Sequence, residues 1–171
     1  MDDRTDRTLV PGAMTRLPAL GSRGEGWVVI QGVLLVVTAA AGSLGPAWDG
    51  TLRLLSSIAG VVLIAAGLWL AARGVRDLRG ALTPLPYPRP GAELVETGVY
   101  ALVRHPIYGG LVIAGVGWGL LTASPAAIAA ALVLLAFFEL KARREEAWLE
   151  GRFAGYAAYR ARTRRLIPWI G

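Results

Sequence analysis

The residues best suited to chemistry gather in Thr97–Gly110, a stretch that contains the only histidine of the chain. Within it, Arg104, His105 and Tyr108 place a permanent cation, a titratable imidazole and a phenol close together. Pro106 predicts the first turn of a helix, because an amide N–H at that position would be unpaired anyway. We therefore expect His105 at or beside the N-cap, where unpaired amides and the helix dipole attract an anion or a carboxylate.

A pair of acidic residues, Glu145 and Glu146, follows after two apolar runs. Taken alone, the pair needs no function, since each glutamate can form an ion pair along its own helix with Lys141 or Arg143. In the same way, His105 alone is explained as a helix cap at a membrane surface. If the two apolar runs form a hairpin, however, the glutamates return to the side of the histidine. The spacing therefore favours one joint site.

The composition favours a membrane protein. Hydrophobic residues make up 54% of the 171 residues and the mean hydropathy is +0.49, more than a soluble domain usually carries. The chain has no cysteine and one histidine, which excludes disulfides, a thiolate nucleophile and a multi-histidine metal site, so we expect no metal. The net charge of +6 comes from cations that flank apolar runs, where they report membrane topology. We therefore expect no nucleic-acid partner.

Four apolar runs predict transmembrane helices in an all-α, polytopic protein. Residues 27–45 carry no charge, and as a helix they would be about 29 Å long, close to the thickness of a bilayer's hydrocarbon core. Residues 52–72 contain one charge, Arg53, at their edge. Residues 106–122 and 125–140 are slightly short for upright spans, and the brief turn between them predicts a tight hairpin.

Five glycines lie in the third run, and they predict close packing against neighbouring helices rather than ligand binding. They are Gly109, Gly110, Gly115, Gly117 and Gly119.

The remaining segments are polar. Residues 1–26 show no apolar periodicity and predict a flexible tail. Residues 73–105 contain the sequence TPLPYPRPG, whose prolines predict a stiff, extended connector, with a proline-rich docking ligand as the less favoured alternative. Residues 141–171 combine eight Lys and Arg with apolar residues at helical spacing, Phe153 among them, and predict an amphipathic helix at the membrane surface. We expect residues 27–171 to form a single domain.

Charge predicts the topology. Four spans place 17 of the 18 Lys and Arg residues on one side of the membrane and leave only Arg53 on the other. By the positive-inside rule the charged side is the cytoplasm. Both termini, His105 and the glutamate pair are then expected to face the cytoplasm.

Several motifs occur in a fixed order along the chain, and together they carry a resemblance to a known family. They are G-x-Y (Gly98, Tyr100), R-H-P-x-Y-x-G (Arg104 to Gly110), E-E-x-x-L (Glu145, Glu146, Leu149), F-x-G-Y-x-x-Y (Phe153 to Tyr159) and Ile167-Pro168. Residues 94–169 thereby resemble the isoprenylcysteine carboxyl methyltransferase and phospholipid methyltransferase family of integral membrane enzymes. The resemblance implies a methyltransferase that uses S-adenosylmethionine and acts on a membrane lipid or a lipid-like, isoprenoid substrate.

S-adenosylmethionine carries a sulfonium, an amino group, a carboxylate and an adenine, so its site needs an anion binder, an acid and an apolar slot. The resemblance places cofactor contacts at His105, at Tyr108 and at the glutamate pair. The candidate cofactor-binding residues are Tyr100, Arg104, His105, Tyr108, Glu145 and Glu146, and the candidate catalytic residues are Lys141, Arg144 and Glu145. We expect Glu145 to face the cofactor, and Glu146 either to support it or to face the lipid headgroups.

The chain departs from the prenylcysteine enzymes at Lys141. Those enzymes have an arginine four residues before the first glutamate, where it engages the carboxylate of the substrate. Lysine cannot make the bidentate contact of an arginine. A prenylcysteine carboxylate, another lipid and a small isoprenoid-like molecule therefore all remain open as acceptors.

The sequence leaves two other classes of function open. One is a membrane reductase of the sterol reductase type that uses NADPH, although such chains usually have more spans than 171 residues provide. The other is a membrane scaffold without catalytic activity, which would keep the motifs for packing alone.

Overall fold

The structure is a computed structural model, and it describes residues 18, 20, 21, 24–78 and 93–168. The described elements are, in order, α1 (Glu25–Ala41), the 3-10 helix η1 (Gly42–Leu44), α2 (Gly50–Leu78), the 3-10 helix η3 (Gly98–Ala101), α3 (Pro106–Leu121), α4 (Pro125–Arg152) and α5 (Tyr156–Arg162). Within these residues the only strand-like pairing is a single bridge between Val103 and Arg164. The prediction of an all-α fold is confirmed for this part of the chain.

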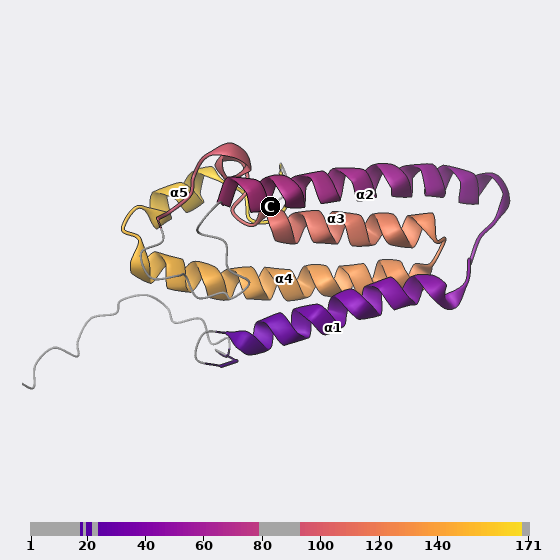
Figure 1. Cartoon of the computed structure of the whole chain (residues 1–171), viewed down its shortest axis with the longest axis horizontal. Helices are drawn as coiled ribbons and strands as arrows, with labels where there is room; N and C mark the ends of the chain where they lie inside the picture. Colours follow the sequence, from indigo (N-terminus) through magenta and orange to yellow (C-terminus); the bar gives the residue numbers. More distant parts are fainter. Residues whose placement is uncertain (1–17, 19, 22–23, 79–92, 169–171) are drawn as a thin grey trace, which may run out of the picture.

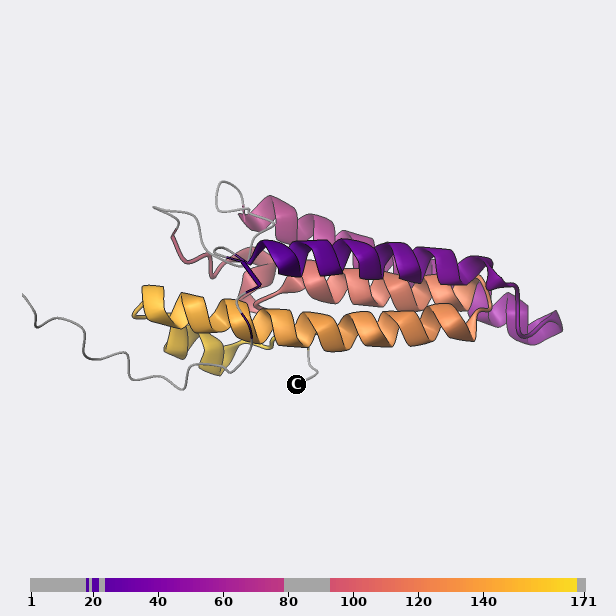
Figure 2. The same cartoon turned by 90° about the horizontal axis from the view of Figure 1, so that it is seen from below.

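The four long helices lie side by side and alternate in direction (Figure 1). Helix α2 packs against α3, α3 against α4, and α4 against α1. The turns from α1 to α2 and from α3 to α4 lie at one end of the molecule, on the right in both views (Figures 1 and 2). The other end gathers the start of α3, the last turns of α2 and α4, and the short helix α5. The predicted site residues belong to this second end.

Three helical segments are long and apolar enough to cross a membrane: Glu25–Leu44, Gly50–Leu78 and Pro125–Arg152. The fourth predicted span, α3, is shorter, with 16 residues, and it lies between α2 and α4. Large apolar side chains are exposed on α1 and α2, among them Val29, Val33, Val36, Leu54, Leu55, Val61, Val62 and Trp69. Such an outer surface suits contact with lipid rather than with water.

The predicted hairpin between α3 and α4 is confirmed. The turn contains Ala123, whose φ of 53° reverses the chain, and Ser124, which caps α4. The hydroxyl of Ser124 accepts a hydrogen bond from the amide of Ala127 at 3.2 Å and donates one to the carbonyl of Ala41 at 2.8 Å. Because Ala41 ends α1, the same serine fastens the hairpin to the first helix.

Glycines let α2 and α3 approach each other closely. A Cβ atom at Gly67 would lie 2.4 Å from the carbonyl oxygen of Gly110, and one at Gly60 would lie 2.6 Å from that of Gly117. On another face of α3, Gly119 abuts Ile128 of α4. The predicted close packing is therefore confirmed, and it occurs on two faces of α3.

The substitution Gly67→Ala is expected to destabilise the helix bundle by about 1–3 kcal/mol, because the new methyl group meets backbone atoms of α3 that have no room to move. Gly32→Ala in α1 is the matched control, since nothing lies within 4 Å of a Cβ atom there. The control should be neutral or slightly stabilising. Unfolding of the purified variants in detergent by increasing SDS measures both effects, and equal stability of the two variants would contradict this packing.

Helices α2 and α1 extend beyond their predicted bounds, α2 at its end and α1 at its start. Helix α2 continues six residues beyond position 72 to Leu78, where Arg73 and Asp77 form an ion pair at 3.9 Å along the helix. The start of the predicted connector is therefore helical, and its proline-rich part falls outside the described residues. Most of the predicted tail, residues 1–26, also falls outside them, although Glu25 and Gly26 already belong to α1.

The prediction of one amphipathic helix over residues 141–171 is wrong. Helix α4 runs unbroken from the hairpin to Arg152. Lys141 and the two glutamates therefore belong to the same continuous helix as the apolar run. The chain then breaks at Phe153, whose φ of −116° and ψ of 110° are extended, and forms α5 after the break. At about 1.5 Å per residue, the 28 residues of α4 exceed the thickness of a bilayer core, so the charged end projects beyond it.

Candidate functional site

The start of α3 is tied to the segment that follows α5. The amide of Arg104 donates to the carbonyl of Arg164 at 2.8 Å, and the amide of His105 donates to that of Arg165 at 2.9 Å. Pro106 is the first residue of α3 and His105 is its N-cap, as predicted. The imidazole makes no capping bond to the helix, and its ring faces α4 instead.

Glu146 lies at the centre of a buried cluster of charges, and only 3% of its surface is exposed. The Nε of Arg104 donates to Oε1 of Glu146 at 2.8 Å, and Nε2 of His105 lies 3.3 Å from the same oxygen. Arg165 adds a bidentate contact, with its Nε and Nη2 each 3.1 Å from one of the two carboxylate oxygens. Glu146 thus joins α4 to the start of α3 and to the segment after α5. The alternative in which Glu146 faces the lipid headgroups is wrong.

Glu145 points to a different part of the same site. Its Oε2 accepts a hydrogen bond from the hydroxyl of Tyr108 at 2.9 Å and lies 3.7 Å from Nδ1 of His105. The side chain of Glu145 remains 22% exposed. A carboxylate offers about four acceptor positions, so this one keeps capacity for a further donor.

Three aromatic rings form a stack beside this carboxylate. The ring of Tyr108 is parallel to that of His105, with centroids 5.4 Å apart, and to that of Phe138, with centroids 4.6 Å apart. The ammonium of Lys141 lies 4.9 Å from the centroid of the Tyr108 ring. Tyr108 thereby links the acid, the imidazole and a cation through one side chain.

The structure does not bring every predicted site residue into this group. The hydroxyl of Tyr100 donates to the carbonyl of Gly74 at 3.3 Å, and its ring packs against α2. The guanidinium of Arg144 lies over the ring of Trp148, 4.4 Å from its centroid, and its buried Nε has no hydrogen-bond partner within the described residues.

Arg104 is a predicted cofactor-binding residue, but its hydrogen bonds are made within the protein. Besides Glu146, its guanidinium donates to the carbonyl of Arg160 at 3.1 Å, to the hydroxyl of Thr163 at 3.2 Å, and to the carbonyl of Thr163. These bonds connect the start of α3 to the end of α5.

Sequence reasoning missed three residues of the site. Arg165 binds Glu146, Gln31 of α1 contacts Lys141, and Tyr156 is buried near the charge cluster. The hydroxyl of Tyr156 has no partner within the described residues. Burial, and next the charge of Glu146, raise the pKa of Tyr156 above its usual range, so the phenol stays protonated. Only Tyr156 had a signal in the sequence, since it belongs to the F-x-G-Y-x-x-Y motif.

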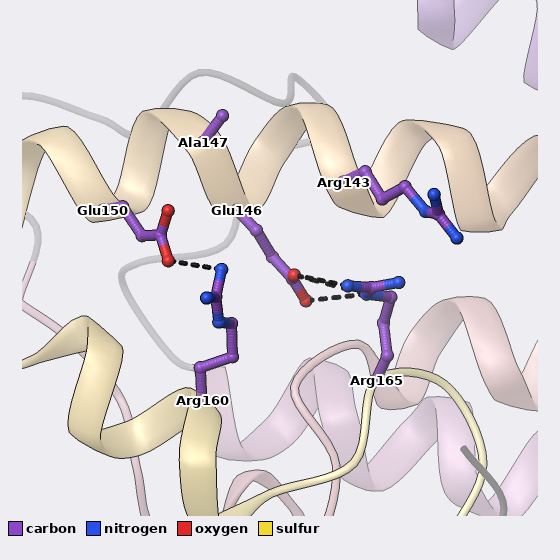
Figure 3. Close-up of a pocket in the computed structure, with 6 residues that line it drawn as sticks. All are labelled: Arg143, Glu146, Ala147, Glu150, Arg160 and Arg165. Atoms are coloured by element: carbon purple, nitrogen blue, oxygen red, sulfur yellow. Dashed lines mark hydrogen bonds and ion pairs between the residues drawn. The ribbon is translucent and has the colours of Figure 1, made fainter. Parts of the chain in front are cut away.

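A polar hollow of about 410 Å³ opens beside the charge cluster, between α4, α5 and the segment after α5 (Figure 3). Its lining residues are Arg143, Glu146, Ala147, Glu150, Arg160 and Arg165. Figure 3 shows Arg165 turned toward Glu146 and Arg160 turned toward Glu150. Arg160 and Glu150 form an ion pair at 2.5 Å. The charged groups that line the hollow are largely paired with one another, so the hollow by itself favours neither an anionic nor a cationic ligand.

The fold and the site define a class: a helical membrane protein whose charged residues gather at one end, where two apolar helices meet. Residues 55–155 match the family model for phospholipid methyltransferases, and the chain belongs to that family. It is also similar to "Protein-S-isoprenylcysteine O-methyltransferase B" of Arabidopsis thaliana, with 36% identity over 80 residues. That match covers 46% of this chain and 41% of the relative, so the chain spans less than half the length of this curated relative. The suspected family is therefore confirmed.

Proposed function

We propose that this protein transfers a methyl group from S-adenosylmethionine to a lipid-like or isoprenoid amphiphile. The observation that carries the proposal is the arrangement of Glu145, Tyr108 and His105, which places a partly exposed carboxylate and an aromatic stack at the end of apolar helices. Membership of the phospholipid methyltransferase family supports the reaction type. The named activity of the plant relative, an O-methyltransferase of isoprenylcysteine, supports an acceptor with an apolar tail.

The residues present fit S-adenosylmethionine. Glu145 is partly exposed and accepts one hydrogen bond, from Tyr108, so its carboxylate can accept another from the amino group or lie against the positive charge of the sulfonium. The hydroxyl of Tyr156 is a buried donor without a partner in the described part of the chain, and it suits a carboxylate. A buried donor without a partner is costly, so this hydroxyl supports the proposal of a bound group.

Three other predicted site residues, Arg104, Glu146 and Tyr100, contribute by holding the elements around the site in place. Arg104 and Glu146 hold the start of α3 against α4, so they position His105 and Tyr108 rather than bind the ligand. Tyr100 fixes η3 against α2. The role that we propose for these three residues is to keep the site in one shape.

When it is bound, S-adenosylmethionine supplies an electrophilic methyl group on a positively charged sulfur. The protein's part is then alignment of the acceptor and exclusion of water, and no covalent nucleophile is needed. Phe138 and the ring of Tyr108 give the site an apolar wall, and the carboxylate of Glu145 gives it a negative charge.

We propose a topology of four spans with both termini in the cytoplasm. Helix α3 is the shortest span, and its position between α2 and α4 supports its insertion. The site end then faces the cytoplasm, together with 17 of the 18 Lys and Arg residues.

Reporter fusions test the topology. A reporter fused after Gly171 should be active in the cytoplasm, and one inserted at Trp48, between α1 and α2, should be active on the opposite side. Two reporters on the same side would contradict the four-span arrangement.

Binding of the product S-adenosylhomocysteine tests the cofactor. Titration of the detergent-purified protein by calorimetry should give saturable binding of S-adenosylhomocysteine and none of NADPH. Binding of NADPH alone would assign the protein to the reductases, and binding of neither would favour a scaffold.

A further inference from the structure

A carboxylate at the end of α2, that of Asp77, contacts the segment that leads into α3. The amide of Val99 donates a hydrogen bond to Oδ2 of Asp77 at 2.9 Å, across 22 positions of the chain. Val99 belongs to η3 and is buried, and the side chain of Asp77 is only 16% exposed. The contact is therefore a partly buried bond between two elements rather than a surface pair.

The start of η3 takes its acceptor from this distant residue. The first amides of a helix have no partner within it, and the side chain of the N-cap residue usually accepts a hydrogen bond from one of them. The N-cap of η3 is Thr97, whose side chain makes no such bond. The carboxylate of Asp77 accepts in its place, and it makes the stronger, charge-assisted kind of hydrogen bond. Helix α2 thereby fixes the position of η3.

Gly98, the first residue of the G-x-Y motif, leaves room for this carboxylate. Its φ of 63° lies in the left-handed region, which favours glycine, and a Cβ atom there would overlap Oδ2 of Asp77. Tyr100, the last residue of the motif, donates to the carbonyl of Gly74 one turn earlier on α2. Both ends of the motif therefore dock on the last turns of α2.

The chain runs from η3 to His105 with little slack. Only residues 102–104 separate η3 from His105, and the amide of Val103 donates back to the carbonyl of Val99 at 3.1 Å. The segment after α5 pairs with the same three residues from the other side. A shift of η3 would therefore be passed to His105, whose Nδ1 lies 3.7 Å from Oε2 of Glu145.

Resting on the proposed function, we propose that Asp77 is a positioning residue for methyl transfer: its carboxylate holds η3 against α2, and η3 sets where His105 meets Glu145. Asp77 itself touches no reacting group in this role. What the role requires of position 77 is an acceptor oxygen at the right place, and the negative charge only strengthens the bond.

Three substitutions of Asp77 separate this role from a general effect of charge. Asp77→Ala removes the acceptor. Asp77→Asn keeps an oxygen at the same place but loses the charge, and with it the longer ion pair to Arg73. Asp77→Glu keeps the charge and the acceptor but adds a methylene, which pushes the carboxylate toward Gly98. The control is Glu96→Gln, because it removes an exposed ion pair, with Arg162, from the same segment.

The first measurement is the rate of methyl transfer by the folded protein in detergent. N-acetyl-S-farnesylcysteine and phosphatidylethanolamine serve as acceptor probes, and kcat and the KM of the acceptor are determined for each variant. We expect Asp77→Ala to lower kcat about tenfold or more, the scale of one charge-assisted hydrogen bond, with the KM of the acceptor unchanged. Asp77→Asn should lose at most about threefold, since a neutral hydrogen bond remains. Asp77→Glu should resemble Asp77→Ala, and Glu96→Gln should match the wild type.

The second measurement needs no activity, because His105 is the only histidine of the chain. NMR spectra of protein labelled with a nitrogen isotope in histidine alone, recorded after removal of any histidine tag, report one imidazole. We expect the signals of its two ring nitrogens to shift in Asp77→Ala and in Asp77→Glu, as the contacts with Glu145 and Glu146 change. They should stay in place in Asp77→Asn and in Glu96→Gln.

A role of Asp77 in stability alone predicts that the folded variants keep the wild-type kcat and the wild-type imidazole signals, and that result would overturn the inference. A loss of kcat in Asp77→Asn as large as in Asp77→Ala would also overturn it, because the charge rather than the acceptor would then matter. Should Asp77→Ala not fold, the comparison of Asp77→Glu with Asp77→Asn decides. If the wild type methylates neither probe and binds no S-adenosylhomocysteine, the proposed function fails, whereas the imidazole signals still show whether Asp77 positions His105.

Discussion

Replacement of Glu146 by glutamine is expected to lower the stability of the protein by about 3–5 kcal/mol, the usual effect of removing one partner from a buried ion pair. The carboxylate is shared by Arg104, His105 and Arg165, and its loss leaves the buried guanidinium of Arg104 without a counter-charge, whereas Arg165 keeps its pair with Glu139. The segment after α5 should detach first, because Arg165 belongs to it. SDS unfolding and the rate of proteolysis near the C-terminus measure the two effects.

Glu150→Gln is the matched control for Glu146→Gln. Glu150 lies one turn further along α4 and pairs with Arg160, but both side chains are more than a third exposed. Exposed pairs contribute about 0–1 kcal/mol. Equal stability of the two variants would show that Glu146 does not hold the site together.

Replacement of Glu145 by glutamine is expected to leave the fold intact and to reduce methyl transfer roughly ten- to a hundredfold, which corresponds to about 1.5–3 kcal/mol for a charge-assisted hydrogen bond. Glutamine can still accept the hydrogen bond from Tyr108, so the aromatic stack should persist. What is lost is the negative charge that we propose to face the cofactor. Initial rates and the affinity for S-adenosylhomocysteine are the measurements.

Glu145→Gln should therefore lose activity but remain folded, whereas Glu146→Gln should lose stability. Wild-type rates for a folded Glu145→Gln protein would make this residue an ordinary surface acid. The proposed site would then lose its acidic group.

Local rules predicted the start of α3 and the hairpin well. A proline after His105 fixes the first turn of a helix, and a serine and a proline between two apolar runs fix a turn and a cap. These signals act within a few residues and depend little on the rest of the fold. The structure confirms both of these predictions.

The remaining features of the site depend on contacts between residues that are distant in the sequence. Glu145 and Glu146 are adjacent in sequence, and contacts with the start of α3 and with the segment after α5 bury Glu146 while Glu145 stays partly exposed. Arg165 is one of eight cations after residue 140, and no pattern in the sequence sets it apart. Gln31 lies within an apolar run, where a single amide gives no signal of its partner on α4.

The end of α4 was misplaced for a related reason. Hydropathy falls at Lys141, and a change in hydropathy marks where a helix leaves the membrane rather than where it ends. Lys141 and Glu146 are buried against other elements, which stabilises the helix beyond the apolar run.

Transfer of a labelled methyl group tests the central claim most directly. The purified protein is incubated in detergent with S-adenosylmethionine labelled in its methyl group and with membrane lipids or prenylated cysteine derivatives, and the label in the organic extract is counted. We predict label in the extract with the wild-type protein and at least about tenfold less with Glu145→Gln. Absence of label with every acceptor, from a protein that is folded and binds S-adenosylhomocysteine, would contradict the claim that this site transfers methyl groups.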